Sequence, residues 1–400
     1  MLFYGFYFQL PLWAEEIPGI SVKSIQEQLT TLPYLSGYVP AKKEVGVIMV
    51  DPSRAYEGLN FYISGDRPAA YLLDMSGKLI HEWSLDSREA WPDRSAMKHW
   101  RKAHLLKNGD ILAIYQGPGS GLVKLDRKSK LLWKYRGDCN NGGPHHDLDV
   151  ADDGRVFLLT SRRVTDLSYK KLGLRGPIME DYITVLNRDG KEIKSFSIID
   201  AFLNSDYSTI LKNMRKAGDI FHTNTIEILK GGGVNRIPSL LAGGLLISIP
   251  HLDTIAVITP EEEKVVWAMS NGWEAQHQPT LLDNGNILIF DNKGNDDNSR
   301  VIEISPISGE IIWQYQGDPP ESFLSKTCGS NQRLPNGNTL ITDTEAGRAF
   351  EVTPKGEVVW DFINPHRAGE EKELTASLFD LIRLETIPDF IKIQPKIVLP

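Results

Sequence analysis

The sequence predicts an all-β protein: a six-bladed β-propeller with helical and loop insertions and a short C-terminal helix. Three observations carry this prediction. A strand–turn–strand pattern that ends in an aromatic residue occurs six times, and a second hairpin pattern with an Asn-Gly or Asp-Gly turn precedes most of the copies. The 400 residues also include 34 Gly and 23 Pro, and so many turn-forming residues favour short strands over a helical bundle.

The chain divides into three parts. Residues 1–44 begin with an apolar stretch, MLFYGFYFQLPLW, that is too short to span a bilayer and lacks the basic start of a secretory signal. We interpret it as the remnant of a signal or membrane anchor, with an apolar strand as the alternative. Residues 45–368 contain the repeats of the propeller. Residues 369–400 include ELTASLFDLIRLETIPDFI, for which we expect a short helix and then an extended tail that closes the ring.

The aromatic-ended hairpins recur at spacings of 46 to 71 residues, a range typical of propeller blades with loop insertions. Five copies end in tryptophan, and a large ring at the same point of each blade is expected to fill the space between neighbouring sheets. We assign this core role to Trp83, Trp133, Trp267, Trp313 and Trp360.

The second pattern supplies the other hairpin of a four-stranded blade. It reads AHLLKNGDILAIY, DLDVADDGRVFLLT, PTLLDNGNILIFD and QRLPNGNTLITD, with a glycine where a tight turn needs positive φ. Two insertions, 161–182 and 197–221, interrupt the repeats. In the second, the apolar residues have helical spacing and predict a helix over one end of the ring, with Ile198, Phe202, Ile210 and Met214 on its apolar face.

Charge and cysteine content exclude several classes of function. The 44 Lys and Arg against 52 Asp and Glu give a net charge of −8, so nucleic-acid binding is not expected. A group of basic residues at 94–107 is interpreted as a solvated strand-and-turn face. The two cysteines, Cys139 and Cys328, form no CxxC pair, which excludes a thiolate zinc site and leaves a single disulfide open.

Histidines recur at one position of the repeat. The first strand of each blade lines the channel of a propeller, so functional residues are expected at its start. His146 and His277 each lie eight residues before their turn glycine, and His222 lies nine before its own. In two other repeats the same position holds Arg101 and Gly329. Converging imidazoles suit a Zn²⁺ or Cu²⁺ site, or nucleophilic and acid–base chemistry, and the residues alone leave both open.

The residue after His146 is acidic. Because side chains alternate along a strand, Asp147 is predicted to point away from the face that carries His146.

Four segments resemble the bacterial arylsulfotransferase family: HHDLDVADDG (145–154), FHTNTIEI (221–228), QHQPTLLDNGNILIFDN (276–292) and residues 329–365. The resemblance covers about residues 65–365 and implies a six-bladed propeller. It also implies transfer of a sulfuryl group from an aryl sulfate to a phenol in two ping-pong steps through a sulfohistidine. Neither 3′-phosphoadenosine 5′-phosphosulfate (PAPS), the nucleotide sulfate donor, nor a metal or other cofactor is implied.

This resemblance assigns roles to residues of the chain. His277 matches the histidine that takes the sulfuryl group, and His146 and His222 match the histidines around it. Asn224 matches the asparagine of the H-x-N motif. Further substrate-binding candidates are His145, His251, Ser330 and Arg333.

The chain departs from the family pattern at one position. The family arginine that follows a serine by two residues falls at Pro250, after Ser248. His251, Arg101 or Arg333 are the candidates to supply the missing positive charge.

The family and the apolar N-terminus together predict a periplasmic or other extracytoplasmic location, with a membrane tether through the N-terminus. The main alternative function is a non-catalytic propeller that binds a ligand or a protein, which would be favoured if His146, His222 and His277 did not converge with Asn224. A metal-dependent hydrolase on a propeller would need Asp, Glu or Asn at channel positions, where the chain has chiefly histidines.

Overall fold

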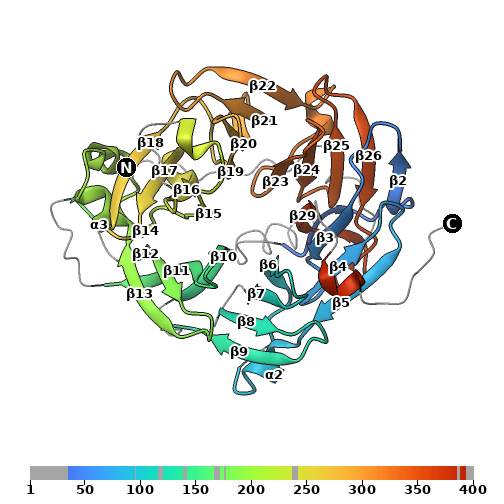
Figure 1. The fold of residues 1–400 in the computed structure, drawn as a ribbon, viewed down its shortest axis with the longest axis horizontal. Coiled ribbons are helices and arrows are strands. Elements are labelled where there is room, and N and C mark those ends of the chain that lie inside the picture. The colour runs from blue at the N-terminus through green and yellow to red at the C-terminus, as the bar shows by residue number, and fades with distance from the viewer. Residues whose placement is uncertain are drawn as a thin grey trace, which may run out of the picture.

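The computed structural model describes residues 35–94, 96–115, 120–137, 142–165, 172–174, 177–236, 242–384 and 388–392. The apolar start of the chain, Cys139 and the end of the C-terminal tail lie outside these residues, so the predictions for them stay predictions. In the described part, strands predominate and their sheets stand around a ring, as in a β-propeller (Figure 1). The prediction of an all-β, propeller-like fold is confirmed. Among the described helices, none has the length and apolar character needed to cross a membrane.

In the described part of the chain, six sheets of four or five strands make up the ring (Figure 1). Within each sheet the strands are named in order from the centre of the ring to its rim. The first sheet contains β29 (Leu378–Leu384), β3 (Leu59–Ser64), β4 (Ala69–Leu73) and β5 (Leu79–Ser84). The second contains β6 (Trp100–Leu105), β7 (Ile111–Tyr115), β8 (Gly121–Leu125) and β9 (Leu131–Tyr135). The third contains β10 (Gly142–Val150), β11 (Val156–Val164), β12 (Ile178–Leu186) and β13 (Glu192–Ser197), with β14 (Gly218–Asp219) parallel to β12.

The other three sheets follow in chain order. The fourth contains β15 (Thr225–Ile228), β16 (Leu245–Ile249), β17 (Thr254–Thr259) and β18 (Lys264–Met269). The fifth contains β19 (His277–Leu281), β20 (Ile287–Asn295), β21 (Asn298–Ile304) and β22 (Ile311–Gln316). The sixth contains β23 (Ser330–Arg333), β24 (Thr339–Asp343), β25 (Arg348–Val352), β26 (Val358–Ile363) and β2 (Gly46–Val50).

The remaining elements are short. A three-stranded sheet is formed by β1 (Gly37–Pro40), β28 (Leu374–Ala376) and β27 (Arg367–Ala368). Among the described residues, the α-helices are α2 (Ser87–Ala90), α3 (Ile198–Leu203) and α4 (Asp389–Lys392). The 3₁₀ helices are η3 (Ser208–Asn213), η4 (Val234–Arg236), η5 (Pro250–Leu252) and η6 (Pro320–Ser322).

The apolar core lies between neighbouring sheets. Alternation along a strand gives each sheet two apolar faces, and each face packs on a different neighbour. On β7, for example, Ile111 and Ala113 belong to the cluster shared with the first sheet, whereas Leu112 and Ile114 belong to the cluster shared with the third. Six such clusters follow one another around the ring, so the sheets hold one another in place and keep the inner strands in register.

The recurring tryptophans link adjacent sheets, but the predicted core burial holds for Trp83, Trp267 and Trp360, whereas Trp133 and Trp313 are only half-buried. The indole N–H of Trp83 donates to the carbonyl of Gly109 at 3.0 Å, in a turn of the next sheet. Trp360 makes the corresponding bond to Met75 at 3.1 Å. The same contact is made from Trp133 to Arg188 and from Trp313 to Pro354. Trp267, for its part, is buried in the cluster between the fourth and fifth sheets.

Two predicted helical segments differ from the structure. The insertion 197–221 does contain a helix, α3, but it has only six residues and packs against β12, β13 and β18. The stretch 373–384, where a short helix was predicted, forms β28 and β29 instead, and the described residues that follow it contain the short helix α4. β29 alternates between buried and half-buried residues, and its pairing with β3 decides in favour of a strand.

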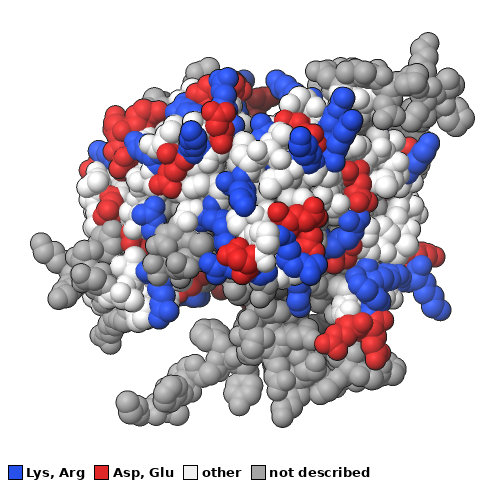
Figure 2. Space-filling model, turned by 90° about the horizontal axis from the view of Figure 1, so that it is seen from below, with Lys and Arg blue, Asp and Glu red and all other residues white. Residues whose placement is uncertain are grey.

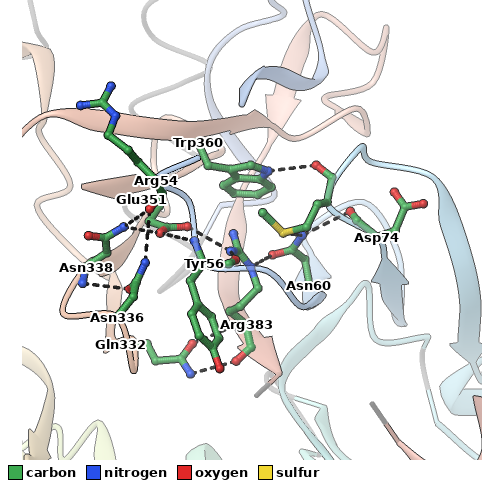
Figure 3. A network of polar contacts seen from close by, with 11 residues as sticks. Arg54, Tyr56, Asn60, Asp74, Gln332, Asn336, Asn338, Glu351, Trp360 and Arg383 are labelled. Atoms are coloured by element: carbon green, nitrogen blue, oxygen red, sulfur yellow. Dashed lines mark hydrogen bonds and ion pairs between the residues drawn. The ribbon is translucent and has the colours of Figure 1, made fainter. Parts of the chain in front are cut away.

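The pairing of β29 with β3 closes the ring, and a buried polar network secures it (Figure 3). The Arg383 guanidinium on β29 lies 3.0 Å from the carboxylate of Glu351, and neither side chain has exposed surface. Arg383 also donates to Asn60 Oδ1 at 2.6 Å and lies 4.9 Å from the Trp360 ring centre. One side chain thus ties β29 to β3 and to the neighbouring sixth sheet.

The surface of the ring mixes both signs of charge. On the face shown in Figure 2, Lys and Arg residues are interspersed with Asp and Glu.

Candidate functional site

A small cavity of about 20 Å³ lies among the innermost strands, with lining residues from all six large sheets. The lining residues are Arg101, Lys102, His146, Asp147, Asn224, Thr225, His277, Gln278, Gly329, Ser330, Phe379 and Asp380. Four of the predicted site residues are therefore brought together here: His146, His277, Asn224 and Ser330. Of the residues at the predicted repeat position, Arg101, His146, His277 and Gly329 line the cavity, whereas His222 does not.

His277 is the first residue of β19, and hydrogen bonds at one ring nitrogen fix the orientation of its side chain. Its Nδ1 lies 2.8 Å from Asn292 Oδ1 and 3.1 Å from the carbonyl of Ala275. The amide nitrogen of Asn292 donates to the carbonyls of Ser325 and Cys328, both at 2.6 Å, which fixes Oδ1 toward the histidine. Because both partners of Nδ1 are acceptors, Nδ1 carries the proton and Nε2 carries a lone pair.

The Nε2 atom of His277 is buried and has no hydrogen-bond partner among the described residues. Burial is the main reason that the pKa of His277 is lowered to about 3, and the charge of Arg101 lowers it further. His277 is therefore neutral at pH 7. A neutral imidazole with a free lone pair in a cavity can act as a nucleophile.

Four other histidines form a continuous row. The Nδ1 atoms of His145 and His146 are 2.8 Å apart, so one donates to the other. The ring centres of His146 and His222 are 4.6 Å apart, and those of His222 and His251 are 4.9 Å apart. Of the predicted site residues, His222, His145 and His251 thus reach the cavity through His146 and do not line it themselves.

Asp219 was missed by the sequence reasoning. Its carboxylate accepts hydrogen bonds from both the Nδ1 and the backbone N–H of His222, three residues later. Burial alone would raise the pKa of Asp219, but these interactions with His222 and the nearby His251 lower it to about 2. Because the carboxylate accepts a hydrogen bond from Nδ1 of His222, the other ring nitrogen, Nε2, is the one that can accept a proton. The Asp three residues before the histidine, in GDIFHTN, was the available signal.

Two cations enter the cavity from β6. Arg101 and Lys102 both line it, and the backbone and side chain of Arg101 are almost fully buried. Lys102 Nζ lies 2.8 Å from Asp380 and 3.3 Å from Asp147, and these carboxylates raise its pKa although burial opposes them. The prediction of a solvated basic face is wrong at these two positions, because β6 is an innermost strand.

Asp147 also departs from its prediction and lines the same cavity as His146. The reason lies in the backbone. His146 has φ of 52°, in the left-handed region, and the register between β10 and β11 shifts between Pro144 and Leu148. This bulge breaks the alternation and brings both side chains to the same cavity.

Arg333 does not reach the cavity. Its guanidinium lies 2.8 Å from Glu303 and 4.6 Å from the ring centre of Trp313, in the gap between the fifth and sixth sheets. The prediction of Arg333 as a substrate-binding residue is therefore not supported by its position, and Arg101 is the arginine that the cavity contains.

The other predicted residues have local partners. Asn224 donates to the carbonyl of Gln276 at 3.0 Å, and the Ser330 hydroxyl donates to Asp380 at 2.8 Å. Pro250 begins η5 and is buried, and it places His251 on the ring of His222. Cys328 is buried near Arg101, whose guanidinium lies 3.7 Å from its sulfur.

Comparison with known proteins gives one family and several structures. The family model described as Arylsulfotransferase (ASST) matches residues 102–365. No curated protein sequence gives a significant match. A protein of unknown function from Bacteroides caccae is similar in structure, with a TM-score of 0.52, 12% identity, and coverage of 83% of this chain and 100% of that protein.

Two other solved structures are similar at lower scores. A streptogramin B lyase has a TM-score of 0.48 and 14% identity, covering 88% of this chain and 98% of its own. The WD40 β-propeller domain of Doa1 has a TM-score of 0.46 and 11% identity, covering 87% and 95%.

Proposed function

This chain belongs to the arylsulfotransferase family, and we propose that it moves a sulfuryl group from an aryl sulfate to a phenol through a covalent intermediate on His277. The observation that carries the proposal is the state of the His277 ring. Nδ1 is held as a donor by Asn292, and Nε2 is buried beside the cavity with no hydrogen-bond partner in the described part of the chain. The convergence of His146, His277 and Asn224 on one cavity favours this function over a non-catalytic binding propeller.

In the first step the Nε2 lone pair attacks the sulfur of the donor ester. An N–S bond forms, the bond from sulfur to the phenol oxygen breaks, and that oxygen takes the electron pair and leaves as a phenolate. The His277 ring, which keeps its Nδ1 proton, becomes an N-sulfonated imidazolium. Asn292 stabilises it by accepting the hydrogen bond from Nδ1, which strengthens as the ring gains positive charge.

In the second step the acceptor phenol loses its proton and attacks the same sulfur. An O–S bond forms, the N–S bond breaks, and His277 recovers its neutral form. We assign the proton to the row of histidines that begins with His146 at the cavity and continues to His222. His222 is the base of this row, because Asp219 holds its Nδ1 and stabilises the imidazolium that results.

Negative charge on the sulfuryl oxygens and on the leaving phenolate needs a cation. Lys102 is committed to two carboxylates, so Arg101 is the residue we assign to this task. Its charge already contributes to the low pKa of both His146 and His277, which places its field across the site. Arg101 would then supply the charge that the chain lacks at Pro250.

Two further assignments complete the proposal. Each of the six large sheets corresponds to one blade, which makes the ring a six-bladed propeller. The apolar character of residues 1–13 and the family membership support an extracytoplasmic location with a membrane tether, although those residues lie outside the described part of the chain.

The test is mass spectrometry of the protein after brief incubation with 4-nitrophenyl sulfate and no acceptor. We expect the peptide that contains His277 to gain one sulfuryl group and to lose it when a phenol is added. The variant His277→Ala should gain none, while His81→Gln, a change on an outer strand, should react as the wild type does. A folded wild-type protein that forms no adduct would contradict the mechanism and favour a binding function.

A further inference from the structure

Asp219, His222 and His251 bring one carboxylate and two imidazoles together next to the cavity. One donor atom of each residue lies within 4.8 Å of the donor atoms of the other two. Both Nδ1 atoms face Asp219: that of His222 is hydrogen-bonded to the carboxylate, and that of His251 lies 3.9 Å from Oδ1. His251 Nδ1 now donates to the backbone carbonyl of Asp219 at 3.0 Å, a hydrogen bond that an ion on this nitrogen would replace. We propose that this triad binds a divalent transition-metal ion of the zinc class.

The spacing of the donors fits such an ion. Zinc binds histidine nitrogen and carboxylate oxygen at about 2.1 Å, so the ligands of a tetrahedral site lie about 3.4 Å from one another. The distance from His251 to Asp219 needs to shorten by only about half an ångström to meet this value. The hydrogen bond between His222 and Asp219 would open by a larger amount as the ion replaces the shared proton.

The chemistry of the donors selects the metal. Two imidazoles and one carboxylate suit Zn²⁺ and its neighbours in the first transition row, whereas Ca²⁺ and Mg²⁺ prefer oxygen ligands. Three protein ligands leave the fourth position to water. The side chains of Asp219, His222 and His251 are 38%, 23% and 19% exposed, so an ion can reach them from solvent.

A bound ion would change the state of His222. Without metal, Nδ1 of His222 carries the proton that Asp219 accepts. A metal on Nδ1 displaces that proton, and the remaining ring proton then sits on Nε2, which can no longer accept one. This consequence rests on the proposed function: if His222 takes the proton of the acceptor phenol, zinc should inhibit the second step of transfer.

The first test is metal binding itself, which does not depend on any enzymatic activity. The full chain, freed of metal with a chelator, is titrated with ZnCl₂ in a calorimeter, and with CoCl₂ while the visible ligand-field absorption is followed. We expect one ion per chain and an intense tetrahedral cobalt spectrum. The variants His251→Gln and Asp219→Asn should each weaken zinc binding by at least about tenfold, and the matched control His81→Gln should bind as the wild type does.

A thermal measurement guards against variants that fold poorly. Zinc should raise the Tm of the wild type and of His81→Gln, but not that of Asp219→Asn, because only an intact site binds the folded state. The proposal is overturned if the wild type binds no ion, or if both site variants bind as the wild type does. Inhibition of adduct discharge by zinc is measured separately, so zinc binding to a protein without transferase activity would refute the proposed function and leave the metal site standing.

Discussion

Removing one member of the buried pair Arg383–Glu351 should strongly destabilise the closed ring. Replacing Arg383 with Met leaves the Glu351 carboxylate fully buried, and among the described residues its remaining hydrogen bonds come from the Tyr56 N–H and Asn338. Breaking a buried pair by removing one partner costs about 3–5 kcal/mol, mostly because the remaining charge is uncompensated. This cost includes the loss of the hydrogen bond from Arg383 to Asn60. We therefore expect the free energy of unfolding to decrease by this amount.

The assay is urea unfolding followed by tryptophan fluorescence, with the slope against urea required to stay constant. The double variant Arg383→Met/Glu351→Gln should lose much less than the sum of the two single variants, because neither charge is then left alone. As a control, Arg54→Met removes a nearby exposed arginine that pairs with Asp51 and Glu357 and should leave the midpoint unchanged (Figure 3). A single Arg383 variant that loses less than about 1 kcal/mol, or additive losses, would refute the reasoning.

Three further outcomes follow from the site and its surroundings. In ¹⁵N NMR spectra the His277 ring should show a protonated Nδ1 and a bare Nε2, with no titration between pH 5 and pH 8, because burial lowers its pKa to about 3; an inflection near pH 6.5 would contradict the assignment. Asn292→Leu should slow formation of the sulfuryl adduct by at least about a hundredfold, as measured in single turnovers, because the ring loses the acceptor that sets its tautomer; an unchanged rate would show that Asn292 does not position the ring. Burial and the neighbouring Asp149 raise the pKa of Glu227 from 4.5 to about 8, so the folded state holds a proton that the unfolded state releases, and stability should fall as the pH rises through this interval. Glu227→Gln should remove that loss of stability, which is checked by comparing the urea midpoints of both proteins at pH 4.5 and pH 8. An equal change of midpoint with pH in the wild type and the variant would contradict the prediction.

The sheets were predictable because their signals are local. An Asn-Gly or Asp-Gly turn needs only adjacent residues, and Gly109 and Gly285 have φ of 87° and 88° in such turns. The tryptophan at the end of each outer hairpin repeats often enough to be recognised. Likewise, His146 and His277 were found because the turn glycine gave a fixed origin from which to count.

The features that were missed depend on distant or irregular contacts. Asp147 faces the cavity only because His146 adopts a left-handed conformation, which no alternation rule anticipates. Lys102 is half-buried and pairs with Asp380, a residue from the far end of the chain. The segment LFDLIRL could be helix or strand by its pattern, and its pairing with β3 decides the outcome. The first repeat did contain a clue, since residues 59–84 supply three strands where the others supply four.

The closure of the first sheet also orders events during synthesis. β3 leaves the ribosome early, but its inner partner β29 follows only after the other five large sheets have been translated. Until then the inner edge of β3 exposes unpaired backbone groups, which form a template for wrong strand partners. A chain interrupted before Leu378 would keep that edge permanently, so nonsense mutations late in the gene should yield aggregation or rapid degradation even though nearly the whole ring has been made.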